Sequence, residues 1–170
     1  MSNTNSIGLH EGSASQLAEK LNELLANYQI FYMNVRGYHW NVKGPQFFQL
    51  HEKFEELYTD LLTKVDEVAE RILTLGHQPV HAYSDYVTMS RIAEEKNVTD
   101  GEACVRGTLK GFQTLIELQR DILSLASDAD DEGTAAQAGD YIREQEKTIW
   151  MLNARSEERR VGKECRSRWS

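Results

Sequence analysis

Long stretches without proline most constrain the fold of this 170-residue chain. Its two prolines are Pro45 and Pro79, and proline is the residue that most strongly breaks a helix. Elsewhere apolar residues recur at steps of three and four, which places them on one face of a helix. The sequence therefore predicts four long helices, over about residues 13–42, 46–75, 100–127 and 135–153.

The links between these helices predict how they are arranged. A few residues around the sequence KGP join the first two helices, and the acidic loop SDADDEGT joins the last two. Short links make antiparallel neighbours, and one long crossover between two helical hairpins is the ferritin-like form of the four-helix bundle. Residues 77–99 supply that crossover, and YSDYVTMSRIAEE within them is expected to form a short helix. The predicted fold is therefore all-α.

The periodic pattern also divides the chain. We expect one ferritin-like bundle over residues 13–154, preceded by a flexible segment over residues 1–12. Residues 155–170 show no periodic apolar face, which predicts a disordered tail. A non-native origin of that tail, such as a read-through scar, stays open.

Charge is unevenly distributed along the chain. The last sixteen residues carry six Lys/Arg and three Glu, whereas residues 1–154 carry 13 basic and 24 acidic groups, a net charge of −11. An acidic body repels phosphate and attracts cations, although the same charge also serves solubility.

No apolar run approaches the length of a membrane span, and the N-terminus lacks the features of a signal peptide. Cys104 and Cys165 are too few for a disulfide framework, so we expect a cytoplasmic protein.

Two pairs of candidate metal ligands are far apart along the second helix. His39 and His51 flank the first short link, so a hairpin brings them close. Asp66 and Glu70 are four residues apart and share a helix face. However, fifteen residues separate His51 from Asp66, which is about 22 Å along a helix. Metal–ligand bonds are roughly 2.0–2.6 Å long, so one chain cannot close both pairs around one ion.

A second copy of the chain is one solution. On a helical wheel, His51, Asp66 and Glu70 lie on one flank beside the core stripe, together with Leu62 and Leu73. That flank is too apolar for a purely solvated face. If a two-fold-related helix packs there antiparallel, the histidines of one copy lie beside the carboxylates of the other, and the interface holds two equal sites. The alternative, a packed histidine pair and an unrelated solvated acidic face, stays open.

The residue types favour iron. Imidazole and carboxylate ligands suit ferrous sites, and the lack of nearby thiolates argues against structural zinc. No Glu-x-x-His occurs, so a di-iron site in the bundle core is not expected. We expect Trp40 to be a packing residue, with a redox role as the alternative. The remaining histidines are expected to be loop residues without function: His10, His77 and His81.

Two long motifs resemble the Dps family, the dodecameric mini-ferritins. They are YHWNVKGPQFFQLHEKFEELY (residues 38–58) and VDEVAERILTLGHQPV (residues 65–80), and the resemblance covers about residues 10–154. It implies a ferroxidase centre between two-fold-related subunits, formed by His39, His51, Asp66 and Glu70. Glu55 matches a further carboxylate that contacts a second iron, so the resemblance implies up to two irons in each site.

The resemblance also implies a function. Such proteins oxidise Fe²⁺, usually with hydrogen peroxide, and store ferric mineral in a hollow shell, which protects the cell against oxidative stress. Acidic pores on three-fold axes admit the iron. The candidates for pore lining here, which a charged turn would also explain, are Asp128, Asp130, Asp131, Glu132 and Asp140.

DNA-binding members of the family have N-terminal tails rich in Lys and Arg. Residues 1–19 contain neither, and such groups supply most non-specific affinity for DNA. We therefore do not expect DNA to bind through the N-terminus, and the basic C-terminal string is the remaining source of such binding. Two alternatives to the iron-storage function remain: a nucleoid-associated protein in which iron oxidation is secondary, and a plain helical oligomer without metal chemistry.

Overall fold

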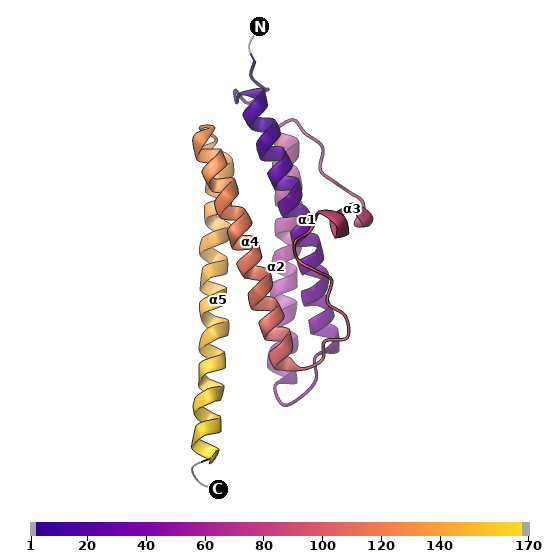
Figure 1. Cartoon of the computed structure of the whole chain (residues 1–170), viewed down its shortest axis with the longest axis vertical. Coiled ribbons are helices and arrows are strands. Elements are labelled where there is room, and N and C mark those ends of the chain that lie inside the picture. The colour runs from indigo at the N-terminus through magenta and orange to yellow at the C-terminus, as the bar shows by residue number, and fades with distance from the viewer. Residues whose placement is uncertain (1–2, 168–170) are drawn as a thin grey trace.

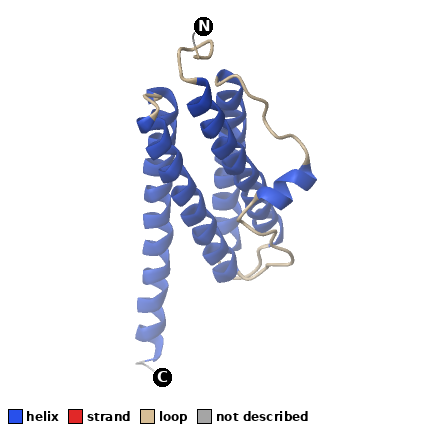
Figure 2. Cartoon of the chain, turned by 45° about the horizontal axis from the view of Figure 1, so that its top comes forward, coloured by secondary structure: helices blue, strands red, loops and turns tan. Residues whose placement is uncertain are grey.

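The computed structural model describes the backbone of residues 3–167 and the side chains of residues 3–156, and this part of the chain is helical and loop structure (Figures 1 and 2). It confirms the all-α fold. The helices are α1 (Glu11–Asn41), α2 (Phe47–Thr74), α3 (Tyr83–Met89), α4 (Gly101–Asp128) and α5 (Glu132–Ser167).

Two antiparallel hairpins make up the bundle. The α1–α2 and α4–α5 connections lie at opposite ends of the molecule, and the long crossover runs along the outside of α1 (Figure 1). The short helix α3 lies within that crossover, outside the bundle and against α1 (Figure 2). The ferritin-like arrangement with one long link is therefore as predicted. Among the described residues, no helix has the length and hydropathy of a membrane span.

Local sequence signals fix the ends of the long helices. The Asp100 carboxylate accepts a hydrogen bond from the Ala103 N–H (2.9 Å), so Asp100 caps the start of α4. At the end of α2, Gly76 adopts a φ of 87°, which residues with a Cβ rarely adopt. The His77 N–H then reaches back to the Ile72 carbonyl (3.1 Å), the pattern that closes many helices after a left-handed glycine. Asp100 thus fixes the start of α4, and Gly76 fixes the end of α2.

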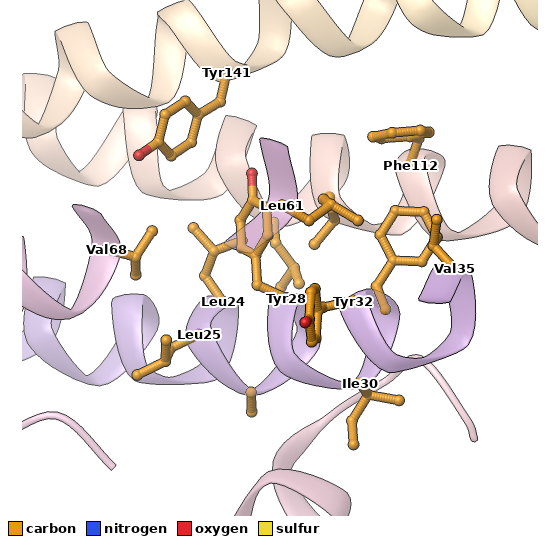
Figure 3. Close-up of a cluster of buried hydrophobic side chains, with 14 of the residues drawn as sticks. Leu24, Leu25, Tyr28, Ile30, Tyr32, Val35, Leu61, Val68, Phe112 and Tyr141 are labelled. Carbon is orange, nitrogen blue, oxygen red and sulfur yellow. The ribbon is translucent and has the colours of Figure 1, made fainter. Parts of the chain in front are cut away.

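The core lies between the two hairpins. The apolar stripe of α2 faces this core, and these of its residues are buried: Phe54, Leu57, Leu61, Val68 and Ile72. Tyr28 of α1 points toward Tyr141 of α5 (Figure 3), and their rings pack edge to face at 6.1 Å. The Tyr28 hydroxyl also joins a closed ring of hydrogen bonds with Gln119 and Gln145. This buried ring of hydrogen bonds consists of a phenol and two amides.

Two glycines allow α1 and α4 to cross closely. A Cβ on Gly107 would overlap the Tyr38 hydroxyl, and a Cβ on Gly111 would overlap the Phe31 ring. Phe31 in turn packs edge to face against Phe112 at 5.0 Å. The backbone of α4 therefore lies directly on aromatic side chains of α1.

The C-terminal end of α5 differs from the prediction. The helix was expected to end near Asn153 and to give way to a disordered tail, but it continues to Ser167 and runs past the ends of the other helices (Figure 1). Arg155 donates hydrogen bonds to Glu102 (3.0 Å) and to Gln46. The following residues contain no proline and are mainly Arg, Glu and Lys, which have high helix propensity. A helix that is already formed extends through such residues without needing an apolar face.

The N-terminal segment also differs from the prediction. We expected a flexible segment over residues 1–12, but α1 begins at Glu11 and the described residues before it form a hydrogen-bonded loop. The Asn5 side chain accepts a hydrogen bond from the Leu9 N–H (2.9 Å) and donates one to the Leu75 carbonyl (3.3 Å). A single amide side chain therefore connects this loop to the end of α2, a contact that a composition-based prediction misses.

The close α1–α4 crossing makes a stability prediction. Alanine favours a helix over glycine by roughly 1 kcal/mol, but at position 111 its methyl group overlaps the Phe31 ring, and overpacking typically costs about 1–3 kcal/mol. We expect the steric cost to exceed the gain, so that Gly111→Ala lowers the urea midpoint. Gly139→Ala is the control, because its Cβ would meet only the Leu123 Cδ1 at 3.8 Å. Gly139→Ala should raise the midpoint; a higher midpoint for Gly111→Ala would contradict the prediction.

Candidate metal centre

The end of α1 and the start of α2 bring two histidines into contact. The rings of His39 and His51 stack with their centroids 3.8 Å apart and their planes inclined by 15°. Only a short turn separates the two helices here, so the hairpin fixes both residues at the same end of the bundle. The prediction that the hairpin brings the two histidines together is confirmed.

Each histidine donates a hydrogen bond to the backbone of the other. The Nδ1 of His39 lies 2.7 Å from the His51 carbonyl oxygen, and the Nδ1 of His51 lies 2.7 Å from the His39 carbonyl oxygen. A carbonyl oxygen can only accept, so each Nδ1 carries the proton. In the neutral imidazole, each Nε2 therefore has a free lone pair, the state that a metal ligand requires.

Aromatic rings enclose the stacked pair. Phe47 stacks on His51 with a centroid distance of 5.0 Å, and Tyr58 packs edge to face against His39 at 5.2 Å. His39 is buried and His51 is half-buried. The imidazoles are therefore held both by hydrogen bonds at their edges and by ring contacts at their faces.

Asp66 and Glu70 form the second pair, farther along α2. Both side chains are exposed. The pKa of the Glu70 carboxyl is raised because it shares a hydrogen bond with Asp66 and is repelled by that charge; burial and the charge of Glu67 add smaller effects. A bound cation would relieve this repulsion, so the pair is suited chemically to a positively charged ligand.

The two pairs do not meet within one chain. Because α2 is continuous from Phe47 to Thr74, the fifteen residues between His51 and Asp66 correspond to about 22 Å. No group of three or more His, Cys, Asp or Glu side chains in the described part of the chain is arranged to hold a metal ion. On the same flank of α2, Leu62 lies between the two pairs and Leu73 lies just beyond Glu70; these leucines are 50% and 59% exposed. A single copy therefore keeps the histidine pair and the carboxylate pair apart and leaves both leucines uncovered.

Comparison with known proteins gives the family. A family model for the ferritin-like domain matches residues 18–160. The chain is 38% identical to the DNA protection during starvation protein of Porphyromonas gingivalis, over 86% of this chain and 92% of that one. It is 41% identical to DNA protection during starvation protein 2 of Bacillus anthracis, over 82% and 95% of the two chains. The chain belongs to the Dps family of ferritin-like proteins.

A solved structure agrees with this assignment. The Dps protein of Vibrio cholerae, described as a member of a broad superfamily of ferritin-like diiron-carboxylate proteins, superposes with a TM-score of 0.88. It is 56% identical in sequence, and the match covers 91% of this chain and 96% of that chain. Together with the family match over residues 18–160, this likeness covers the histidine pair, the carboxylate pair and the turn between α4 and α5 of this Dps chain.

The acids in and near the α4–α5 turn have different surroundings. Asp128, Asp130, Glu132 and Asp140 are exposed. Asp131 is 3% exposed, accepts a hydrogen bond from the Thr134 N–H (3.0 Å) and pairs with Arg71 of α2 at 2.7 Å. We predicted Asp131 as a pore residue, but its carboxylate is neutralised inside the bundle and caps α5. The sequence did not show this because Arg71 is sixty residues away.

Sequence analysis also missed a buried lysine. The Lys64 ammonium group lies 2.7 Å from Asp60 and 2.8 Å from Glu144, and its side chain is only 5% exposed. Burial lowers the pKa of Lys64, but its hydrogen bonds to Asp60 and Glu144 outweigh that effect and leave the pKa raised. Asp60 four residues earlier was the available signal. Lys64, the Arg71–Asp131 ion pair and a hydrogen bond from Tyr141 to Glu67 connect α2 to α5 and to the residue before it through polar groups.

The remaining candidates have other surroundings than expected. Trp40 is 58% exposed and its ring lies 4.8 Å from the Arg36 guanidinium carbon, so its packing is limited to one side. His10 is not a simple loop residue: its Nδ1 accepts a hydrogen bond from the Gly12 N–H (3.2 Å) and caps α1. His77 and His81 lie in the crossover, as predicted.

The burial of Asp131 leads to a stability prediction. In Asp131→Asn the side chain still caps the helix and Arg71 keeps its hydrogen bond to Thr134, but Arg71 loses its negatively charged partner. Breaking a buried pair costs roughly 3–5 kcal/mol; because Arg71 is 19% exposed, we expect a smaller loss of about 2 kcal/mol in the free energy of unfolding. Asp130→Asn is the matched control. Its backbone φ of 55° suits Asn, so urea unfolding should change little. Equal losses of unfolding free energy in both variants would show that the Arg71–Asp131 pair does not stabilise the fold.

Proposed function

We propose that this Dps chain oxidises Fe²⁺ at sites shared between two-fold-related copies and stores the ferric product in a hollow shell, as a dodecamer. The observation that carries the proposal is the reciprocal hydrogen bonding of His39 and His51, which leaves both Nε2 atoms free for a metal. Asp66 and Glu70 of the second copy supply the carboxylates. Imidazole and carboxylate together suit ferrous iron.

The exposed flank of α2 supports the sharing of the site. If two copies pack antiparallel there, Leu62 and Leu73 become buried, and His51 of each copy lies beside the acidic pair of the other. The mutual repulsion of Asp66 and Glu70 then acts in favour of binding, because iron cancels it. We include Glu55, which is exposed four residues after His51, as a further carboxylate for a second iron.

The stacking geometry favours two ions in each site. A metal ion bound to an imidazole lies near the ring plane. The ring centroids of His39 and His51 are 3.8 Å apart and the ring planes are inclined by only 15°, so the planes meet far beyond the roughly 2.1 Å length of a metal–nitrogen bond. One ion cannot lie in both planes, so each histidine takes its own.

Two ferrous ions match the oxidant that we propose. Reduction of one hydrogen peroxide to two waters takes two electrons and two protons, and two Fe²⁺ supply the electrons as they become Fe³⁺. Paired oxidation therefore consumes peroxide without releasing a one-electron product. Removal of iron and peroxide together would protect the cell against oxidative stress, which agrees with the protective names of the relatives.

Co-assembly of two inactive variants tests the shared site. His51→Ala and Asp66→Ala should each slow rapid iron oxidation by more than roughly 100-fold, because even residues that only support a metal ligand cost 10–100-fold. In shells assembled from equal amounts of both, half of the interfaces are mixed and each keeps one of its two sites, so about a quarter of the sites recover. Stopped-flow absorbance of ferric iron after addition of peroxide measures this.

The matched controls are His81→Ala and Glu94→Ala, which make the same kinds of change on the crossover, away from both half-sites. They should oxidise iron at the wild-type rate. Shell formation by all variants is checked by light scattering. Assembled mixed shells that recover no activity, or single variants that stay active, would count against a shared site.

We further propose that the exposed acids of the α4–α5 turn admit iron. Asp128 and Asp130 are the best candidates, because Asp131 is paired internally and Asp140 lies 3.1 Å from Arg143. Three copies around an axis would concentrate negative potential, and such focusing raises cation on-rates by roughly 10–10³-fold.

The double variant Asp128→Asn/Asp130→Asn tests the entry route. Iron uptake should slow by about tenfold or more at low salt, and the difference from wild type should narrow at high salt, where screening is strong. The final iron load should not change. Glu94→Gln/Glu95→Gln removes the same charge from the crossover and should leave uptake unchanged. Equal rates of iron uptake in the turn variant and the wild type at low salt would show that these acids only form a solvated turn.

A further inference from the structure

We propose that Arg36 is a positioning residue of the iron site, which acts on His39 through the ring of Tyr58. The inference rests on the proposed function. Arg36 is one helical turn before His39 on α1, so both residues lie on the same side of that helix. Nothing in the ligand set itself requires an arginine at this position.

Three aromatic rings surround the Arg36 guanidinium. Its central carbon lies 4.8 Å from the ring centroid of Trp40, 5.5 Å from that of Tyr58 and 5.8 Å from that of Tyr32. Its Nη1 also donates a hydrogen bond to the Tyr32 hydroxyl (2.6 Å). The planar group thus joins two rings of α1 to one ring of α2. A lysine would keep the charge but not the stacking plane.

Tyr58 transmits this arrangement to the metal ligand. Its ring packs edge to face against Tyr32 at 6.0 Å and against His39 at 5.2 Å. The other side of the histidine pair is closed by Phe47, which stacks on His51. Tyr58 and Phe47 therefore stand at the two ends of the stacked imidazoles, and Arg36 fixes the end that is formed by Tyr58.

The charge of Arg36 is unfavourable for an iron site, which makes its position informative. A cation near the histidines repels Fe²⁺. Moreover, the Arg36 Nε–H is buried without a hydrogen-bond partner among the described residues, and such a donor destabilises the fold. An arginine with these two disadvantages is explained by its contacts with the rings, not by a role as a charge.

The two explanations predict opposite effects of removing the charge. If Arg36 acts only as a nearby cation, Arg36→Met should strengthen divalent metal binding. If it positions Tyr58 and thereby His39, the same change should weaken binding by about 10–100-fold, the range typical of residues that support a metal ligand.

We would measure binding of Co²⁺, which reports on ligation by its visible spectrum and does not need an oxidant, to assembled shells of each variant. Arg36→Met, Arg36→Lys and Tyr58→Leu should each weaken Co²⁺ binding by about tenfold or more and alter the spectrum. Tyr58→Phe keeps the ring and should bind Co²⁺ as wild type does. Arg120→Met is the matched control, because Arg120 is an exposed arginine on α4 that pairs with Glu146.

The outcomes separate this inference from the proposed function. Wild-type shells that neither bind Co²⁺ nor oxidise iron would overturn the proposed function itself. Active wild-type shells whose Arg36→Met variant binds Co²⁺ equally well or more tightly would overturn the role of Arg36 alone. Urea unfolding of every variant is followed in parallel. Positioning through the ring is supported if Arg36→Lys and Tyr58→Leu both lose Co²⁺ binding and Tyr58→Phe does not.

Discussion

The continuity of α2 is the constraint on which the rest of the arrangement depends. A continuous helix of 28 residues carries His51 near one end and Asp66 and Glu70 toward the other. Side chains cannot bridge the distance of about 22 Å between His51 and Asp66. Each copy therefore offers imidazoles at one place and carboxylates at another. Leu62 lies between them and Leu73 lies just beyond Glu70, and both are uncovered, so the flank of α2 that carries the proposed ligands is exposed where the proposed second copy would pack.

Much of the fold follows from the sequence because its signals are local. Helix periodicity, the scarcity of proline, the cap at Asp100 and the stop at Gly76 each depend on a few neighbouring residues. The pairing of His39 with His51 was also predictable, because a short link holds the end of α1 beside the start of α2. The pairing of Lys64 with Glu144 and of Asp131 with Arg71 was not, because contacts between distant segments decide whether a charged residue is buried or solvated. The full length of α5 was missed for a different reason, because a helix that is already packed can extend through residues with good propensity but no apolar face.

The two sides of the bundle are closed by different kinds of interaction. Where α1 crosses α4, glycines bring the backbone onto aromatic rings, and the contact depends on shape. Where α2 faces α5, the contacts are ion pairs and hydrogen bonds of Lys64, Glu67 and Arg71. Apolar packing tolerates salt but not added volume, whereas ion pairs tolerate small changes in shape but weaken when a charge is lost. His51, Asp66 and Glu70 all lie on α2, and this helix is held from one side by packing within its hairpin and from the other by charge.

The mutual hydrogen bonds of His39 and His51 have a consequence for the rate of metal capture. Both imidazoles are already fixed in rotamer and tautomer by the backbone of the opposite helix, so no side chain has to be ordered when an ion arrives. The conformational entropy of the ligands is lost during folding instead. If the proposed site binds an ion, the ion would need only to exchange water for nitrogen at these two residues. On this half of the proposed site, the speed of capture would then depend on how readily each metal releases water, and not on motion of the protein.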